Sequence, residues 1–160
     1  MINQRYFQQV QLLIQVLGQV AREPVFALKA GTAINLFIRD MPRLSVDIDL
    51  TYLPVVDRAT GLKAITESLE RIKGYLASLS PRIESTIIQQ QDGIEAKLLC
   101  SQRSVQVKVE VNTILRGSLL PPVNLPIQET VEKEFGLFSA NQIMPLGELY
   151  GGKLCAALDR

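Results

Sequence analysis

The chain has 160 residues, 47% of them hydrophobic, which suits one domain with a buried core. Seventeen basic and sixteen acidic side chains leave a net charge of +1, so no overall field attracts nucleic acid, and only a local basic patch stays open. The sequence holds no histidine, which excludes Ser-His-Asp and Cys-His catalysis and acid–base work by imidazole.

The remaining composition points to a soluble cytoplasmic protein without a membrane partner. Cys100 and Cys155 lie far apart in apolar surroundings, which argues against a disulfide framework and against a zinc site. The N-terminus has no signal-peptide pattern, and no apolar run approaches the ~18 residues that span a bilayer. The chemistry left open is that of carboxylates, lysine, arginine, hydroxyls and hard metal ions.

The first segments predict a helix followed by a buried strand. Apolar residues recur at helical spacing over residues 3–21, so we expect an amphipathic helix there. Pro24 disfavours helix at the preceding residue and therefore marks its end. The short apolar run 25–28 is typical of a buried strand.

The segment after this strand has the composition of an anion site. Gly31 permits a tight backbone, and Thr32 is a good N-cap for a helix predicted over residues 33–38. Free amide groups at such a helix start would attract a phosphate.

Asp47 and Asp49 alternate with apolar residues in the predicted strand 46–50. Alternate side chains of a strand share a face, so both carboxylates point the same way, with Cα atoms ~6.6 Å apart. At that reach they can hold one or two divalent metals. An isolated Asp-x-Asp is more often an ordinary polar strand face, but the amides at Gly31 and the acid at Glu110 favour the metal site.

The middle of the chain predicts a second helix and a group of strands. The helix covers residues 57–79 and ends at Pro81. The strand candidates are residues 82–90, 94–100 and 105–111, and Asp92-Gly93 predicts a hairpin between the first two. The third strand alternates, with its valines on one face and Gln106, Lys108, Glu110 and Asn112 on the other.

The last part of the sequence is less regular. Residues 116–127 carry glycine and three prolines and predict a loop. Residues 131–143 are ambiguous and could form short strands broken by Gly136, whereas residues 146–160 have a helical pattern. The whole order predicts a mixed α+β fold with a central sheet flanked by helices.

Three further residues each have two interpretations. Arg43 and Ser45 either bond within their own loop or contact a triphosphate, Arg43 as a bidentate donor. Residues 147–154 approach the phosphate-loop pattern, but Leu154 replaces its hydroxyl residue and no clear strand precedes it, so we exclude that motif. Lys153 is then either a surface lysine or a phosphate contact on a helix beside two glycines.

Two stretches carry a family resemblance. Ala30-Gly31-Thr32, ten residues, and then Arg-Leu-Ser-Val-Asp-Ile-Asp at 43–49 follow the pattern GG-T, spacer, R-x-S-x-D-I-D. This pattern resembles the first motif of the AbiEii/AbiGii-type nucleotidyltransferase toxins, which belong to the DNA polymerase β-like superfamily. Residues 108–112 look like the strand with the next acidic position, and residues 149–160 are similar to the lysine motif. The resemblance covers about residues 20–160.

The resemblance implies a polymerase β-like minimal nucleotidyltransferase fold over residues 1–160, without the helical C-terminal part of the family. It implies Mg²⁺ or Mn²⁺ as cofactor and an NTP as substrate. The implied metal ligands are Asp47, Asp49 and Glu110. The implied nucleotide contacts are Gly31, Thr32, Arg43 and Ser45. Lys153 would contact the phosphates and complete the catalytic set with the three acids.

The family also implies a function in abortive-infection and toxin–antitoxin systems. We expect transfer of a nucleoside monophosphate from the NTP to an acceptor, with RNA and specifically transfer RNA as the candidate, and an antitoxin protein as partner. The alternative is a catalytically inactive nucleotide-binding or protein-interaction module of the same fold. Two departures from the family pattern support this alternative. Ala30 stands where the first motif has glycine, and the family's next acidic segment would come only after Arg160, outside this sequence.

Overall fold

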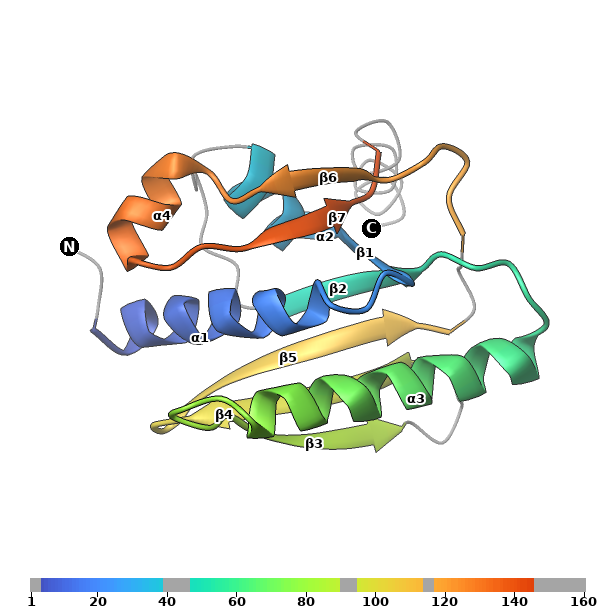
Figure 1. Ribbon diagram of the computed structural model, residues 1–160, viewed down its shortest axis with the longest axis horizontal. Coiled ribbons are helices and arrows are strands. Elements are labelled where there is room, and N and C mark those ends of the chain that lie inside the picture. Colours follow the sequence, from blue (N-terminus) through green and yellow to red (C-terminus); the bar gives the residue numbers. More distant parts are fainter. Residues whose placement is uncertain (1–3, 39–46, 90–94, 114–116, 146–160) are drawn as a thin grey trace, which may run out of the picture.

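A mixed β-sheet in the order β3-β4-β5-β2-β1-β7-β6 runs through the molecule (Figure 1). The computed structural model describes residues 4–38, 47–89, 95–113 and 117–145. The seven strands are β1 (Phe26–Lys29), β2 (Asp47–Tyr52), β3 (Glu84–Gln89), β4 (Glu95–Gln102), β5 (Val105–Asn112), β6 (Val123–Pro126) and β7 (Ala140–Ile143). The helices are α1 (Gln4–Val20), α2 (Ala30–Ala33), the π-helix η1 (Ile34–Ile38), α3 (Arg58–Ala77) and α4 (Glu129–Phe135).

The sheet joins antiparallel hairpins through two parallel contacts. β3–β4, β4–β5, β1–β2 and β6–β7 are antiparallel, whereas β2 pairs with β5 and β1 with β7 in parallel. This pairing places β2 in the interior of the sheet, between β1 and β5. The residues of β2 therefore have fixed neighbours on both sides.

The two long helices cover one face of the sheet. In Figure 1 α1 and α3 lie in front of the strands, and α2 lies behind them near β1. The helices bury apolar stripes against the sheet, with Leu13 and Leu17 on α1 and Leu69 and Ile72 on α3 fully buried. The buried faces of the strands meet these stripes, and burial of apolar area on this scale is the main source of stability. None of the helices in the described ranges has the length and apolarity that a bilayer crossing demands.

A buried carboxylate ties the loop after α1 to α3. Glu23 is 5% exposed and accepts hydrogen bonds from Arg71 Nε at 2.9 Å, Arg71 Nη2 at 2.7 Å and the Tyr75 hydroxyl at 2.8 Å. Burial by itself raises the pKa of Glu23, but the hydrogen bonds from Arg71 and Tyr75 outweigh it and hold the pKa below its usual value. Arg22 completes the cluster with its guanidinium 3.7 Å from the centre of the Tyr75 ring.

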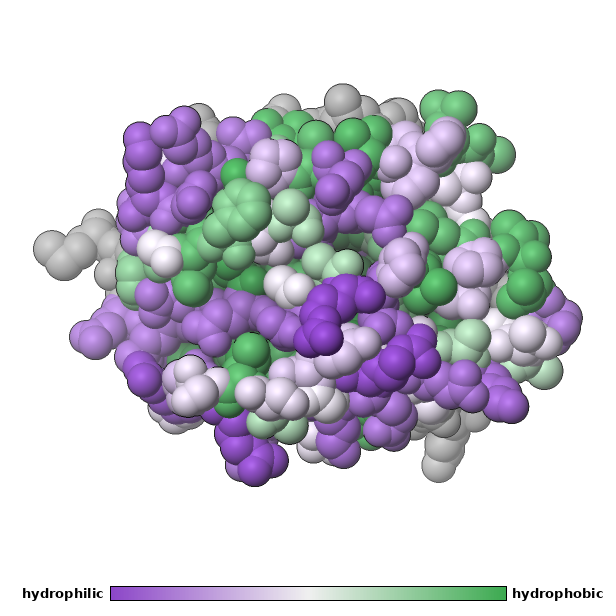
Figure 2. Space-filling view, in the orientation of Figure 1, coloured by the Kyte–Doolittle hydropathy of each residue, from purple (hydrophilic) through white to green (hydrophobic). Residues whose placement is uncertain are grey.

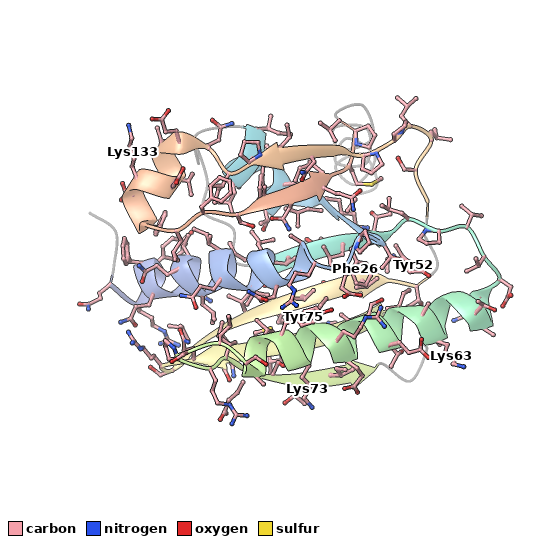
Figure 3. The ribbon with its side chains drawn as sticks, viewed as in Figure 1. Phe26, Tyr52, Lys63, Lys73, Tyr75 and Lys133 are labelled. Atoms are coloured by element: carbon pink, nitrogen blue, oxygen red, sulfur yellow. The ribbon has the colours of Figure 1, made fainter. Side chains whose placement is uncertain are left out.

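Aromatic packing closes the other side of this region. The rings of Phe26 on β1 and Tyr52 on β2 meet edge to face with centroids 6.1 Å apart, and Figure 3 shows them near one another with Tyr75 on α3. Such pairs add to the stabilisation from buried area. The start of β1 and the end of β2 are therefore held together by side chains as well as by the backbone ladder.

Exposed apolar residues gather at one end of the molecule. Figure 2 shows apolar atoms at the end where the loops from β2 to α3 and from β5 to β6 lie. Val55 and Leu119 are the most exposed large apolar residues described, at 85% and 93%. Val55 packs close to Gly117, whose φ of +83° is one that glycine adopts without strain.

Most predicted elements are confirmed. The helices predicted over 3–21 and 57–79 are α1 and α3, and Asp57 caps α3 by accepting a hydrogen bond from the Thr60 amide at 2.9 Å. The strand predictions for β1 to β5 are confirmed within two residues at each end. The hairpin predicted at Asp92-Gly93 agrees with the antiparallel pairing of β3 and β4, although the turn lies outside the described residues.

Two local predictions are wrong, and a third, which was left open, is confirmed only in its second half. The helix predicted to begin after Thr32 begins at Ala30 instead. The loop predicted over 116–127 contains β6, an edge strand that tolerates proline because its outer amides face no partner. Short strands were an open possibility for residues 131–143, but the structure has helix α4, which ends at Gly136 with φ +68°, followed by β7. The predicted helix 146–160 lies outside the described residues.

Candidate active site

Asp47 and Asp49 share one face of β2. Both are half-buried, whereas Ile48 and Leu50 on the opposite face are fully buried under the helices. This confirms the predicted alternation. The two carboxylates lie on the sheet face that α1 and α3 leave uncovered.

The sheet places a third acid directly beside this pair. In the parallel register of β2 and β5, Asp49 is opposite Glu110 and Asp47 is opposite Lys108. Paired strands lie about 4.8 Å apart, so the Asp49 and Glu110 side chains rise from neighbouring points of the same face. Like charges at such positions repel one another and destabilise a sheet unless cations compensate them.

Lysines flank the two acids on both sides. Lys29 on β1 is opposite Asp49, and Lys97 on β4 is opposite Glu110, so one row across four strands reads Lys, Asp, Glu, Lys. The Glu110 Oε1 atom is 3.7 Å from Lys97 Nζ and 4.0 Å from Lys108 Nζ. These contacts offset the repulsion between Glu110 and Asp49.

In this structure Glu110 therefore pairs with lysines. No group of three acidic or cysteine side chains within the described ranges is close enough to hold a metal ion. Asp47 and Asp49 nevertheless supply the carboxylate oxygens that hard divalent cations prefer, and their donor set fits Mg²⁺ or Mn²⁺.

Thr32 connects the segment after β1 to the acidic strand. Its side chain is fully buried, and its hydroxyl donates a hydrogen bond to the main-chain carbonyl of Asp47. This contact holds the first turn of α2 against the start of β2 and explains why Thr32 is not an N-cap. Gly31 lies in the same turn, partly exposed. The predicted contacts of Gly31 and Thr32 with a nucleotide stay predictions.

Three predicted site residues cannot be placed. Arg43, Ser45 and Lys153 lie outside the described residues, as does the glycine pair beside Lys153. Their roles stay predictions.

Sequence reasoning missed Lys29 and Lys97 as neighbours of the acids. Lys29 lies just before the Gly31 motif, and Lys97 lies on a strand predicted only for its hairpin. Neither is close to the aspartates in the sequence, and only the strand order brings them to Asp49 and Glu110. The signal that finds them is strand register: β1 with β2 joins Lys29 to Asp49, and β4 with β5 joins Lys97 to Glu110.

Comparison with solved structures bears on the fold. The chain is similar in fold to MenT4, a nucleotidyltransferase toxin from Mycobacterium tuberculosis, with a TM-score of 0.62 and 17% sequence identity. The alignment covers 93% of this chain and 51% of MenT4, so the chain spans about half the length of that protein. Among curated proteins, none matches this sequence.

The family assignment comes from the sequence. The family model described as nucleotidyl transferase AbiEii toxin of type IV toxin–antitoxin systems matches residues 11–160, nearly the whole chain. This match includes the strands that carry Asp47, Asp49 and Glu110. The chain therefore belongs to the AbiEii nucleotidyltransferase toxin family.

Proposed function

We propose that the chain transfers a nucleoside monophosphate from an NTP to an acceptor, with RNA as the acceptor class and transfer RNA as its candidate. The observation that carries this proposal is the position of Asp49 beside Asp47 on one strand and beside Glu110 on the next. Three acids on the sheet face opposite α1 and α3, offset by lysines, cost stability without improving the core. Such an arrangement is typical of a functional site.

The proposed chemistry is a displacement at the α-phosphorus of the NTP. The acceptor hydroxyl attacks that phosphorus, a new P–O bond forms, and the bond to the β-phosphate bridge oxygen breaks. Pyrophosphate leaves with those electrons, and the hydroxyl proton passes to solvent or a carboxylate. A bound Mg²⁺ or Mn²⁺ would neutralise the phosphate charge and orient the triphosphate.

Each site residue has its own role in this reaction. Asp47 and Asp49 hold the metal on the face where the nucleotide binds. Glu110 is the third candidate ligand and must exchange its contacts with Lys97 and Lys108 for the ion. The two lysines released in this way lie beside the site and can contact phosphate oxygens.

The nucleotide contacts of the proposal rest on the sequence motif. Gly31 and Thr32 would approach the phosphates through their backbone, since the Thr32 hydroxyl is engaged by the Asp47 carbonyl. Arg43, Ser45 and Lys153 would supply the side-chain donors. An antitoxin protein is the proposed partner, because the matching family model describes toxins of toxin–antitoxin systems.

Label transfer tests the proposal. The chain is incubated with each α-phosphate-labelled NTP, Mg²⁺ or Mn²⁺, and total RNA, and labelled RNA is resolved on a gel. We expect transfer by the natural chain and at least a hundredfold loss in Asp47→Asn and Asp49→Asn. Glu70→Gln is the matched control, because this exposed acid on α3 lies on the covered side of the sheet and should leave transfer unchanged.

A second candidate function is a nucleotide-binding module without catalysis. The pairing of Glu110 with Lys97 and Lys108 favours it, since this acid is not gathered with the two aspartates. Calorimetry separates the two functions. Two results together would support the module: the natural chain binds Mg-NTP but transfers no label, and Asp47→Asn abolishes that binding.

A further inference from the structure

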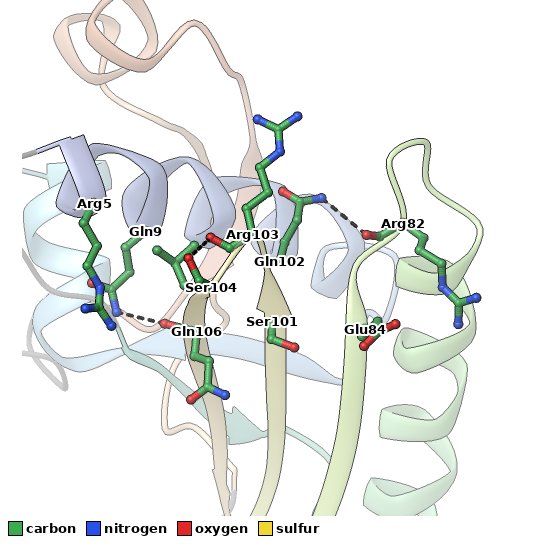
Figure 4. Close-up of a pocket in the computed structure, with 10 residues that line it drawn as sticks. Arg5, Gln9, Arg82, Glu84, Ser101, Gln102, Arg103, Ser104 and Gln106 are labelled. Carbon is green, nitrogen blue, oxygen red and sulfur yellow. Dashed lines mark hydrogen bonds between the residues drawn. The ribbon is translucent and has the colours of Figure 1, made fainter.

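A basic cavity lies at the end of the sheet where β3 and β5 begin and β4 ends. Its volume is about 750 Å³, and it surrounds the tip of the β4–β5 hairpin. Figure 4 shows Arg5 and Gln9 from α1 on one side of this tip and Arg82 and Glu84 on the other, with Arg103 at the tip itself. Three separate parts of the chain therefore build the cavity.

The cavity lining carries a clear charge imbalance. Its charged residues are three arginines, Arg5, Arg82 and Arg103, and one carboxylate, Glu84. No ion pair within the described ranges involves Arg82 or Arg103, in contrast to Arg71, which is held by Glu23. Guanidinium groups of this kind bind phosphate oxygens through paired hydrogen bonds.

The uncharged polar side chains of the lining suit a phosphate and sugar ligand, and Val105 is the apolar member of the lining. They are amides and hydroxyls from the same elements: Gln9, Gln102, Gln106, Ser101 and Ser104. In nucleic-acid complexes such groups contact phosphate and sugar beside arginines. Gln9 is already fixed, because its amide donates to the Gln106 carbonyl at 2.8 Å, and this bond joins α1 to β5 at the cavity.

One of the arginines lies in a turn with strained backbone. Arg103 and Ser104 form the two-residue turn between the paired residues Gln102 and Val105, and their φ values are +51° and +64°. This turn type favours Asn-Gly, because glycine adopts positive φ without cost. The sequence keeps two residues with side chains at strained positions, a pattern that clusters at functional sites.

The polar face of β5 joins the cavity to the three acids. Gln106, Lys108 and Glu110 follow one another on the polar face of β5, so Gln106 lies ~13 Å from Glu110 along the strand. Gln106 and Lys108 are exposed, and no helix in the described part of the chain covers this path. A strand of a few nucleotides can reach from the cavity to the acids.

We propose that this cavity binds the phosphodiester backbone of the acceptor RNA, at nucleotides upstream of the end that reacts at Asp47 and Asp49. This inference rests on the proposed function. The three arginines position the strand, and Lys108 continues the basic path toward Glu110. Because phosphate contacts carry no base information, the cavity gives affinity and register, and the acceptor sequence is read elsewhere.

Direct binding tests the proposal without catalysis. A fluorescein-labelled RNA hairpin with a single-stranded 3′ overhang is titrated in the absence of NTP, and fluorescence anisotropy reports binding. We expect R82Q/R103Q to weaken binding at least tenfold. The slope of log K against log salt should fall by about 1.4, which is two lost phosphate contacts at ~0.7 each.

The matched control removes the same charge from the covered side. Lys63 and Lys73 are exposed on α3 (Figure 3) and do not line the cavity, so K63Q/K73Q should change binding less than twofold. Equal weakening by the two double variants would overturn the proposal, because net charge alone would then explain the effect. Unchanged binding in R82Q/R103Q would also overturn it. Thermal melting of each variant shows that the fold is intact.

Two additional measurements separate the alternatives. If R82Q/R103Q weakens binding of polyglutamate but not of RNA, the cavity binds an acidic protein and the RNA proposal fails. Asp47→Asn should lose label transfer but retain RNA binding. Weakened binding in R82Q/R103Q, with no transfer by the natural chain, would refute the proposed transferase function and leave an RNA-binding cavity.

Discussion

Asp49 on β2 and Glu110 on β5 lie directly opposite one another in a parallel strand pair, although they come from distant parts of the sequence. Two carboxylates at such positions repel, and Lys97 and Lys108 beside Glu110 only partly compensate, since both are solvent-accessible. A divalent cation would remove this repulsion more completely. The stability of the chain should therefore respond to metal.

We predict that Mg²⁺ or Mn²⁺ raises the thermal midpoint of the natural chain and leaves that of Asp49→Asn unchanged. A ligand that binds only the folded state stabilises it by about 2.7 kcal/mol at a hundred times its Kd. Differential scanning fluorimetry over a metal titration measures this. The Glu70→Gln control should respond like the natural chain, and an equal response in Asp49→Asn would place the metal elsewhere.

The Glu23 cluster should be the main polar contribution to stability between the loop after α1 and helix α3. Glu23→Gln keeps the shape but loses the charge that accepts from Arg71 and Tyr75. We expect a loss of about 1–2 kcal/mol in the free energy of unfolding, since Arg71 is half-exposed and water screens part of the ion pair. Urea unfolding at pH 7 measures it, and an effect as small as that of exposed Glu67→Gln would contradict it.

Glu23 should also make the stability of the folded chain depend on pH. The pKa of Glu23 in the folded chain is below its usual 4.5, so its contribution is present above that value. It is lost as the pH falls through the lowered folded pKa, where the carboxylate takes up a proton. The thermal midpoint of Glu23→Gln should therefore fall less than that of the natural chain between pH 5 and pH 3. If the thermal midpoints of the two proteins fall in parallel with pH, other groups cause the acid sensitivity.

The residues of the β4–β5 turn should lower the free energy of unfolding, while they place Arg103 at the cavity. The double substitution R103N/S104G gives the turn the residues that its positive φ values favour. We expect the free energy of unfolding to rise by about 1–2 kcal/mol, while RNA binding weakens through the loss of Arg103. Ser101→Gly, which places glycine in the neighbouring strand β4, should instead destabilise. A double variant less stable than the natural chain would show that the turn is not strained.

Two glycines should respond to alanine with opposite signs. Gly136 ends α4 at φ +68°, so Gly136→Ala should cost about 1 kcal/mol through backbone strain, although a Cβ there meets no neighbour. Gly74 lies within α3, and a Cβ there also meets nothing, so Gly74→Ala should stabilise by up to ~1 kcal/mol. Chemical denaturation compares the two variants. The same sign for both would mean that space, not backbone conformation, governs these positions.

The sequence by itself predicted the long helices and the alternating strands, because periodicity is local. Helix α1 and strand β5 each carry enough apolar residues at a fixed spacing to define which side faces the core. Strand β6 and helix α4 were not identified. Pro126 gives β6 the signature of a loop, and α4 buries only Val131 and Phe135, too few residues for a period.

In the candidate site, too, the sequence predicted the local features and not the contacts between strands. That Asp47 and Asp49 share a face follows from two-residue spacing in a strand, and the structure confirms it. Glu110 was expected beside them, but the flanking lysines do not follow from the sequence, because only strand order brings those residues together. Lys29 and Glu110 reach Asp49 in this way, and Lys97 reaches Glu110 through the pairing of β4 with β5.

The basic cavity is the clearest case of a feature that tertiary structure decided. Arg5, Arg82 and Arg103 form no cluster in the sequence, and a net charge of +1 gave no reason to expect one. They gather because α1 packs on β5, and because the β4–β5 turn and the first residues of β3 lie at the same end of the sheet. Local spacing fixes which way a side chain points, but the order of strands in the sheet decides which charges it meets.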